Sequence, residues 1–247
     1  ENEYLRVTIA DEGAELISVW DKTLNQERIW TADPVFWNRH APILFPFVGK
    51  VKDGTYRIGD TEFAMKTQHG FARDRIFACV EKTAVSVTHC LAAADDTRAI
   101  YPFEFRLTVC HRLLPGKQLA IEWTIENLGE DQMLFSIGGH PGFNVPLSDG
   151  TTFSDYYLEF SKVTPVRQLI LTDACFMTDE TKPFPLEGGT VYRLHHDMFD
   201  HDAIFLTDVA PSVTLKSDKT SRAVTVSYDN MPTLGLWHAP KTDAPYL

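Results

Sequence analysis

The chain has 247 residues, of which 44% are hydrophobic, so it has enough material for one large domain or two small ones with a substantial core. It carries 34 acidic and 23 basic residues, which gives a formal net charge of -11. A nucleic-acid backbone or an anionic membrane surface would be repelled by this charge, so neither is an expected partner. The longest wholly apolar run, residues 41–48, is too short to cross a bilayer and contains two prolines.

The cysteines point to a reducing environment. There are four of them, and each lies within or beside an apolar stretch where a reduced thiol behaves as a small hydrophobe: Cys79, Cys90, Cys110 and Cys175. None belongs to a CxxC pair, so neither a metal site nor a redox motif is indicated. The first residues, ENEYLRV, have no signal-peptide character. We therefore expect a cytoplasmic protein.

The first half of the chain predicts three β-hairpins. Segments 3–11 and 14–20 show period-two alternation on either side of the turn-forming Asp-Glu-Gly. Two further pairs of alternating segments flank Gly59-Asp60 and Pro115-Gly116. The stretch at 92–96 is expected to be a surface loop or a short helical turn.

The second half continues with short strands rich in β-branched and aromatic residues. They are expected at 156–160, 191–196, 203–209, 212–217, 223–229 and 234–239. No Gly/Ser-rich linker, internal repeat or low-complexity segment divides the chain. The pattern predicts an all-β fold, a single large antiparallel sandwich with functional residues converging on a sheet face.

A histidine in a glycine-rich loop is the first candidate for chemistry. In FSIGGHPGFNVPL, residues 135–147, His140 follows Gly138 and Gly139 and precedes Pro141. The glycines permit unusual backbone conformations or a close approach to a ligand, and the proline disfavours a helical His140. The loop is either built to direct the imidazole at a ligand or is a tight turn whose histidine bonds a nearby carbonyl.

Other candidates precede buried or glycine-containing segments. Arg39 comes directly before the apolar run at 41–48, where it is either a ligand-binding residue or a surface arginine at a strand end. His69 precedes a glycine, and Arg73 with Asp74 follows closely. We interpret Arg73 and Asp74 as a structural ion pair.

The segment HHDMFDHDAIFL, residues 195–206, has the composition of a metal site but the wrong spacing. Adjacent histidines point to opposite faces of an extended chain, whereas zinc needs three or four converging ligands. We therefore expect no metal at His195, His196 or His201. Asp202, beside the apolar stretch at 203–206, is the better candidate for a polar group at the rim of a site.

These pieces together resemble a known family. Segments 38–50, 68–75, 101–105, 136–147 and 199–206, in this order, are similar to the aldose 1-epimerase (galactose mutarotase) family in its shorter bacterial branch. HGFARD, and the HPGFN that follows a double glycine, are the most specific motifs. The resemblance implies a galactose mutarotase-like β-supersandwich. It also implies interconversion of the α and β anomers of a hexose, with no metal or organic cofactor.

The resemblance also implies roles for four residues. His140 corresponds to the general acid and His69 to a second active-site histidine, whereas Arg39 and Asp202 correspond to residues that hydrogen-bond sugar hydroxyls. Asp200 replaces Asp202 if the alignment shifts by two. Histidine suits reversible proton transfer because its pKa, about 6.5, is close to the working pH.

The family's general base is a glutamate in an IEPW-like motif after the LGLW strand, and residues 1–247 contain no such motif. We therefore expect residues 1–247 to be a single galactose mutarotase-like domain that lacks its C-terminal strands, with the base following Leu247. Glu187 and Glu62 are conceivable substitutes within the chain, although nothing in their surroundings favours either.

Two alternatives to a hexose epimerase stay open. One is a sugar-binding relative that uses Arg39, His69, His140 and Asp202 for recognition and catalyses nothing. The other is a hexose-6-phosphate 1-epimerase, whose phosphate would need a cationic cluster at the pocket rim. That cluster would come from Lys50, Lys52, Arg73 and Arg75. In each case the expected partner is a small sugar, and the protein is expected to be a monomer or a homodimer.

Overall fold

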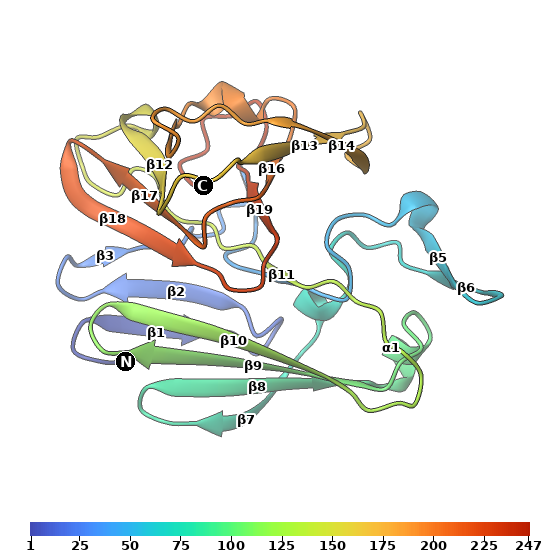
Figure 1. Ribbon diagram of the computed structural model, residues 1–247. Helices are drawn as coiled ribbons and strands as arrows, with labels where there is room; N and C mark the ends of the chain where they lie inside the picture. The colour runs from blue at the N-terminus through green and yellow to red at the C-terminus, as the bar shows by residue number, and fades with distance from the viewer. The chain divides into compact units, whose positions relative to one another are not determined.

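The computed structural model describes residues 1–247, drawn as a ribbon in Figure 1. The chain divides into two compact units, each with its own core. The first unit consists of residues 1–31 and 39–142, and the second of residues 32–38 and 143–247. Both units are built almost entirely from antiparallel strands. The predicted all-β, antiparallel sandwich is confirmed, and the prediction that residues 1–247 form a single domain stays a prediction.

The first unit contains eleven strands and one short helix. A three-stranded sheet has the order β1-β2-β3, a four-stranded sheet has the order β10-β9-β8-β7, and β11-β4 and β5-β6 are two-stranded. The bounds are β1 Leu5–Ile9, β2 Leu16–Asp21, β3 Gln26–Glu27, β4 Ile43–Leu44, β5 Thr55–Ile58, β6 Thr61–Ala64, β7 Ala78–Lys82, β8 Ser86–Ala92, α1 Asp95–Arg98, β9 Phe105–Leu114, β10 Gln118–Asn127 and β11 Gly138–Gly139. Short 3₁₀ turns lie at Lys52–Gly54 and Ala72–Asp74.

The second unit contains two four-stranded sheets, with the orders β15-β12-β17-β18 and β14-β13-β16-β19. The bounds are β12 Tyr156–Phe160, β13 Arg167–Leu171, β14 Met177–Pro183, β15 Val191–Arg193, β16 Ile204–Thr207, β17 Ser212–Ser217, β18 Thr220–Ser227 and β19 Thr233–Leu236. Further 3₁₀ turns lie at Phe153–Asp155 and His196–Phe199.

The three predicted hairpins are confirmed as the antiparallel pairs β1–β2, β5–β6 and β9–β10. The stretch at 92–96 runs into α1, which begins at Asp95, so the alternative of a short helical turn is confirmed. Two hairpins, β7–β8 and β13–β14, were not predicted. All five residues of β7 are exposed and all five of β13 are half-buried, so neither strand shows the alternation that identifies a strand in sequence.

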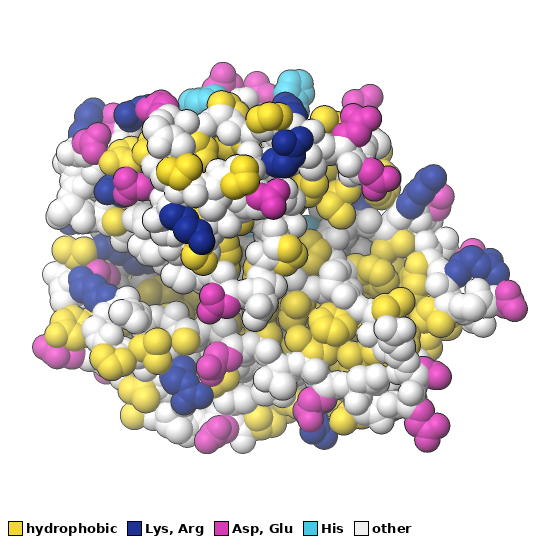
Figure 2. Space-filling model, viewed as in Figure 1, with side chains coloured by type: hydrophobic (Ala, Val, Ile, Leu, Met, Phe, Trp, Pro, Cys, Tyr) yellow, Lys and Arg dark blue, Asp and Glu magenta, His cyan; other side chains and the backbone are white.

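Charged side chains are mixed over the surface that Figure 2 shows. Lysine and arginine are interspersed with aspartate and glutamate there, and no cluster of basic side chains is visible on that face. The chain's one α-helix, α1, has four residues, and no helix in the structure is long and apolar enough to span a membrane.

The core of the first unit forms on one face of the β10-β9-β8-β7 sheet. Alternate residues of β9 point inward, and Phe105, Leu107 and Val109 are fully buried. They belong to a cluster with Phe45 and Phe71, whose rings contact each other edge to face. Burying such side chains stabilises a fold by roughly 1.5–3 kcal/mol each. The segments that carry residues 45 and 71 are therefore fixed to the sheet.

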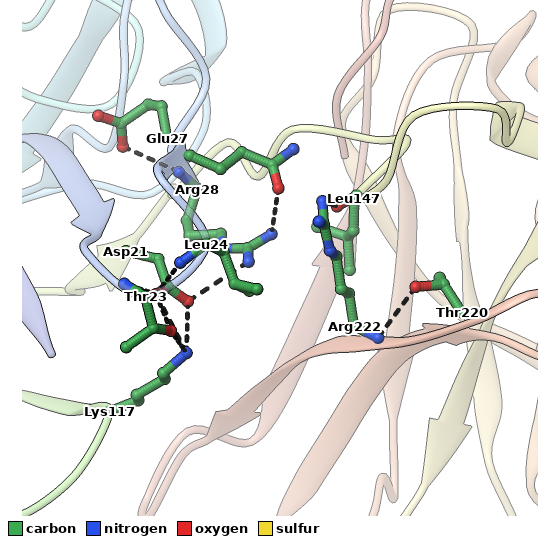
Figure 3. A network of polar contacts seen from close by, with 10 residues as sticks. Asp21, Thr23, Leu24, Glu27, Arg28, Lys117, Leu147, Thr220 and Arg222 are labelled. Carbon is green, nitrogen blue, oxygen red and sulfur yellow. Dashed lines mark hydrogen bonds and ion pairs between the residues drawn. The ribbon is translucent and has the colours of Figure 1, made fainter.

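A polar network ties the end of β2 to the β9–β10 turn (Figure 3). Asp21 is 3% exposed and accepts hydrogen bonds from the side chains of Thr23 and Lys117 and from the backbone N–H groups of Thr23 and Leu24. Burial alone would raise the pKa of Asp21, but the hydrogen bonds from Lys117, Thr23 and Leu24 outweigh it and lower the pKa. The carboxylate is thus held in its charged form.

The core of the second unit is formed by side chains of its strands and of residues 145–153, which precede β12. Phe153, Phe160 and Phe199 are buried together with aliphatic side chains of β16 and β17. Arg222 on β18 donates from Nη1 to the carbonyl of Leu147 at 3.2 Å, a contact drawn in Figure 3. This bond links residues 145–153 to the sheet that contains β18.

Two histidines are buried in the first unit. His89 on β8 and His111 on β9 are 2% and 3% exposed, and the Nδ1 atom of each lacks a hydrogen-bond partner. His89 Nε2 lies 3.0 Å from Asp11 Oδ1. Burial, together with the neighbouring His89, lowers the pKa of His111 to about 4. The folded protein therefore favours neutral His111.

Glycine is required at residue 70, where we expect an alanine to be severely destabilising. Gly70 has a φ of +70°, and a Cβ there would lie 2.2 Å from the carbonyl oxygen of Phe45. Gly59→Ala is the matched control, because Gly59 also has a positive φ but has nothing within 4 Å of its Cβ position. Both substitutions incur about 1–3 kcal/mol of backbone strain, and only Gly70→Ala adds the overlap. Thermal unfolding should show a much lower Tm for Gly70→Ala, and equal Tm values would contradict this account.

We expect acid to destabilise the first unit through His111. In the unfolded chain His111 takes up a proton near pH 6.5, whereas the folded protein resists protonation until about pH 4. The free energy of unfolding should therefore fall with pH across this window, by up to about 3 kcal/mol. Urea unfolding at several pH values should show a shallower loss for His111→Phe than for the wild type. His201→Gln, at an exposed position, serves as the control and should keep the wild-type slope.

Candidate functional site

His69 lies in a tight turn that fixes its ring. Its φ is +66°, in the left-handed region, and Gly70 follows at +70°. The backbone N–H of His69 donates to the carbonyl of Gly49 at 2.7 Å, and the N–H of Gly49 donates to His69 Nδ1 at 2.9 Å. Because Nδ1 accepts this bond, the neutral ring carries its proton on Nε2. His69 is thus arranged as a hydrogen-bond donor through Nε2.

His140 follows β11, and the backbone of residues 40–44 supports its turn. β11 pairs antiparallel with β4, so that Gly138 lies opposite Leu44 and Gly139 opposite Ile43. The N–H of His140 then donates to the carbonyl of Pro42 at 3.0 Å.

The double glycine before His140 has a packing reason as well. A Cβ on Gly139 would lie 3.1 Å from the ring of Trp123, which is tighter than nine in ten real contacts. Close packing against Trp123 therefore favours glycine directly before His140, because any side chain would have to displace that ring by a few tenths of an ångström.

The two histidines lie together. Their ring centroids are 6.0 Å apart with an interplanar angle of 75°. Burial lowers the pKa of His140, a hydrogen bond to its own backbone acts in the opposite direction, and the charge of Arg73 adds to the lowering. The His140 residue as a whole is partly buried.

Arg39 belongs to an ion-pair cluster. Its Nη2 donates to Asp74 Oδ1 at 2.5 Å, and its Nη1 donates to the carbonyl of Arg73 at 3.5 Å. Arg73 Nε lies 3.8 Å from Asp74 Oδ2, so the expected ion pair between neighbouring residues is present, with Arg39 as a further member. Asp74 therefore balances two guanidinium groups.

Glu15 is a buried carboxylate next to the Arg39–Arg73–Asp74 cluster, and the sequence analysis did not identify it. It is 9% exposed, and its Oε1 accepts the N–H groups of His40 at 2.7 Å and Ala41 at 2.8 Å. Its charge also favours the charged form of Arg73. In the sequence, Glu15 is simply one polar residue before a strand, and the only signal was an acidic residue beside an apolar run.

Asp202 lies in the second unit, directly before β16, and its carboxylate is held at both oxygens. Oδ1 accepts the N–H of Ala203 at 2.9 Å, and Oδ2 accepts the thiol of Cys175 at 3.2 Å. Asp202 has a φ of +81°. The alternative, Asp200, lies at the end of the 3₁₀ turn His196–Phe199. The convergence of Asp202 with Arg39, His69 and His140 stays a prediction.

Two of the three histidines of segment 195–206, His195 and His196, have protein partners. His195 Nδ1 hydrogen-bonds Asp197, and His196 Nδ1 lies 3.1 Å from His238 Nε2. His238 is fully buried and bonds the carbonyl of Ala239 through Nδ1 at 2.8 Å. His201 is exposed. These contacts explain the side chains as parts of a hydrogen-bonded turn.

The two glutamates considered as substitute bases lie on exposed hairpins. Glu62 on β6 is 3.8 Å from Arg57, and Glu187 accepts from Arg193 Nε at 3.1 Å. The side chains of Glu62 and Glu187 are 58% and 61% exposed. Neither glutamate lies in a buried pocket, and each is paired with an arginine on the surface, so nothing in their surroundings marks either as a base.

Comparison with known proteins decides the family. The sequence model described as Aldose 1-epimerase matches residues 1–247. The chain belongs to the aldose 1-epimerase family. It is 37% identical over 246 residues to the chromosomal protein LacX of Lactococcus lactis subsp. lactis, an alignment that covers 96% of this chain and 81% of LacX.

Two solved members of the family's fold are very similar to this structure. A galactose mutarotase-like protein from Lactobacillus casei ATCC 334 superposes with a TM-score of 0.92 at 34% identity, covering 100% of this chain and 84% of that one. A galactose mutarotase related enzyme from Lactobacillus acidophilus superposes with a TM-score of 0.91 at 33% identity, covering 100% and 83%. The predicted galactose mutarotase-like fold is confirmed.

The charge of Arg73 should be measurable in the titration of His140. Removing it with Arg73→Gln takes away one cause of the lowered pKa, so the pKa of His140 should rise toward 6.5. NMR titration of ¹³C-labelled histidine measures this directly. Arg75→Gln is the matched control, because Arg75 pairs with Asp96 and is not among the causes. An unchanged His140 pKa in Arg73→Gln would contradict the electrostatic account.

Proposed function

We propose that the protein is an aldose 1-epimerase, which interconverts the α and β anomers of a hexose with His140 as the general acid. The observation that carries the proposal is the pairing of His69 and His140, whose ring centroids are 6.0 Å apart on turns formed by the family's own motifs. Family membership supports the reaction class.

The chemistry needs a group that gives and retrieves a proton. His140 protonates the ring oxygen of the sugar while the C1 hydroxyl loses its proton, the bond between C1 and the ring oxygen breaks, and an aldehyde forms. Rotation about C1–C2 exposes the other carbonyl face, and reclosure returns the proton to His140. A histidine serves both directions because its usual pKa is close to the working pH, and burial and the charge of Arg73 lower the pKa of His140 from that value.

His69 and Arg39 act differently from His140. Because Gly49 occupies Nδ1, His69 offers its Nε2–H to a sugar oxygen as a neutral donor and orients the ring. Arg39 has five N–H donors in a fixed planar arrangement. Asp74 and the carbonyl of Arg73 accept two of them, and the remaining donors suit hydroxyl oxygens of a sugar. Asp202 accepts from a sugar hydroxyl in this proposal.

The general base in this proposal is the glutamate that the family resemblance places in an IEPW-like segment after the LGLW strand. A carboxylate there would accept the C1 hydroxyl proton and return it on reclosure. The proposal is therefore tested on full-length protein.

The ion pairs of Arg73 and Arg75, two of the four basic residues considered for a phosphate, support a neutral hexose over a hexose 6-phosphate. Arg75 is paired with Asp96, and Arg73 lies between Asp74 and Glu15. A phosphate carries close to two negative charges and would have to displace these carboxylates. A sugar-binding protein without catalysis would need the same hydrogen-bonding groups but would not need a titratable His140.

Replacement of His140 by asparagine should separate catalysis from binding. Asn tolerates tight turns and keeps polar atoms near the ring positions, but it has no titratable proton. We expect kcat for mutarotation to fall by about 10² or more, equivalent to about 2.7 kcal/mol of transition-state stabilisation, while sugar affinity changes little. Polarimetry of freshly dissolved α-glucose or α-galactose measures the rate, and calorimetry measures the affinity.

The control for this variant is His195→Asn, because His195 is exposed and its partner is its near neighbour Asp197. It should keep wild-type kcat. Mutarotation at the wild-type rate by His140→Asn would sink the assignment of the acid, whereas a wild-type protein that binds sugar without turnover would favour the binding alternative.

A further inference from the structure

Cys175 contacts Asp202 from a neighbouring hairpin. Its Sγ lies 3.2 Å from Asp202 Oδ2, and the other carboxylate oxygen accepts the N–H of Ala203. Cys175 has a φ of +62° and Asp202 a φ of +81°, so both residues adopt left-handed conformations. The two turns therefore meet through side chains at positions where the backbone itself is strained.

The sheet explains why these two turns meet. β13 pairs antiparallel with β16, with Arg167 opposite Thr207 and Gln168 opposite Leu206. β13 ends at Leu171 and leads into the β13–β14 turn, which contains Cys175, and β16 begins two residues after Asp202. Within that turn, the N–H of Cys175 donates to the carbonyl of Thr172 at 2.8 Å. The turn is thus closed on itself and directs the thiol at the carboxylate.

We propose that Cys175 is a positioning residue for Asp202: its thiol donates to Oδ2 and fixes the carboxylate in the orientation that accepts a sugar hydroxyl. This inference rests on the sugar-binding role proposed for Asp202. Its consequence is that blocking the Cys175 thiol lowers sugar affinity. A carboxylate held by two donors loses less freedom when a hydroxyl binds than one that rotates freely.

The chemistry of the donor allows a matched test. A thiol is a weak donor, a hydroxyl is a stronger one, and a methyl group is none. Cys175→Ala and Cys175→Ser place residues of similar size at the same positive φ, so both variants share the same backbone strain. Any difference between the two variants therefore reports the hydrogen bond to Asp202.

The kinetic experiment uses full-length protein and polarimetry. Cys175→Ala should raise KM about three- to tenfold with kcat nearly unchanged, because the lost bond acts on binding in the ground state and the transition state alike. Cys175→Ser should restore KM to the wild-type value or below. Cys79→Ala, an exposed cysteine of the first unit, is the control and should behave as wild type. A purely structural Cys175 predicts instead a lower Tm in Cys175→Ala with KM unmoved, which would overturn the proposal.

A second experiment does not depend on turnover. Iodoacetamide forms a bond from sulfur to carbon with loss of iodide and the thiol proton, and mass spectrometry of peptides gives its rate at each cysteine. Saturating galactose or glucose should slow the reaction at Cys175 and leave Cys79 unaffected. Protection of Cys175 in a protein without mutarotase activity would remove the epimerase proposal and uphold this one. Equal alkylation of Cys175 with and without sugar would overturn it.

Discussion

The backbone of residues 40–45 is the constraint on which the candidate site depends. The carbonyl of Phe45 accepts the N–H groups of Phe71 at 3.0 Å and Ala72 at 3.1 Å, and so holds the turn that carries His69. The carbonyl of Pro42 accepts the N–H of His140. One extended segment therefore fixes both imidazoles, and the ring of Phe45 anchors that segment in the core. Geometry at the site follows from core packing rather than from the surface loops alone.

Electrostatic balance accompanies this arrangement. The guanidinium groups of Arg39 and Arg73 face the carboxylates of Asp74 and Glu15, so the cluster is close to neutral. Neutrality matters because unbalanced cations would bind anions and would suppress protonation of His140 further. Burial is the main cause of the lowered pKa of His140, and the charge of Arg73 adds to it. The surroundings thus suit an uncharged ligand.

Local sequence patterns were enough to predict the hairpins and the two histidine-containing turns. The β9–β10 hairpin is recognisable because Phe105, Leu107 and Val109 alternate with outward residues over ten positions. His69 and His140 stood out because glycines next to them indicate special turns. Glu15 and Cys175 were missed, because their importance comes from contacts with Ala41 and Asp202, 26 and 27 residues away along the chain. No local periodicity reports such contacts, and only the folded backbone creates them.

The bond from Gly49 to the imidazole of His69 ties a backbone amide to one tautomer of the ring. A backbone amide that donates to a carbonyl is indifferent to pH, but here the acceptor is a titratable nitrogen. When Nδ1 gains a proton, two N–H groups face each other, and the amide of Gly49 must find another acceptor. The chemical shift of the Gly49 amide therefore reports which nitrogen of the His69 ring carries the proton.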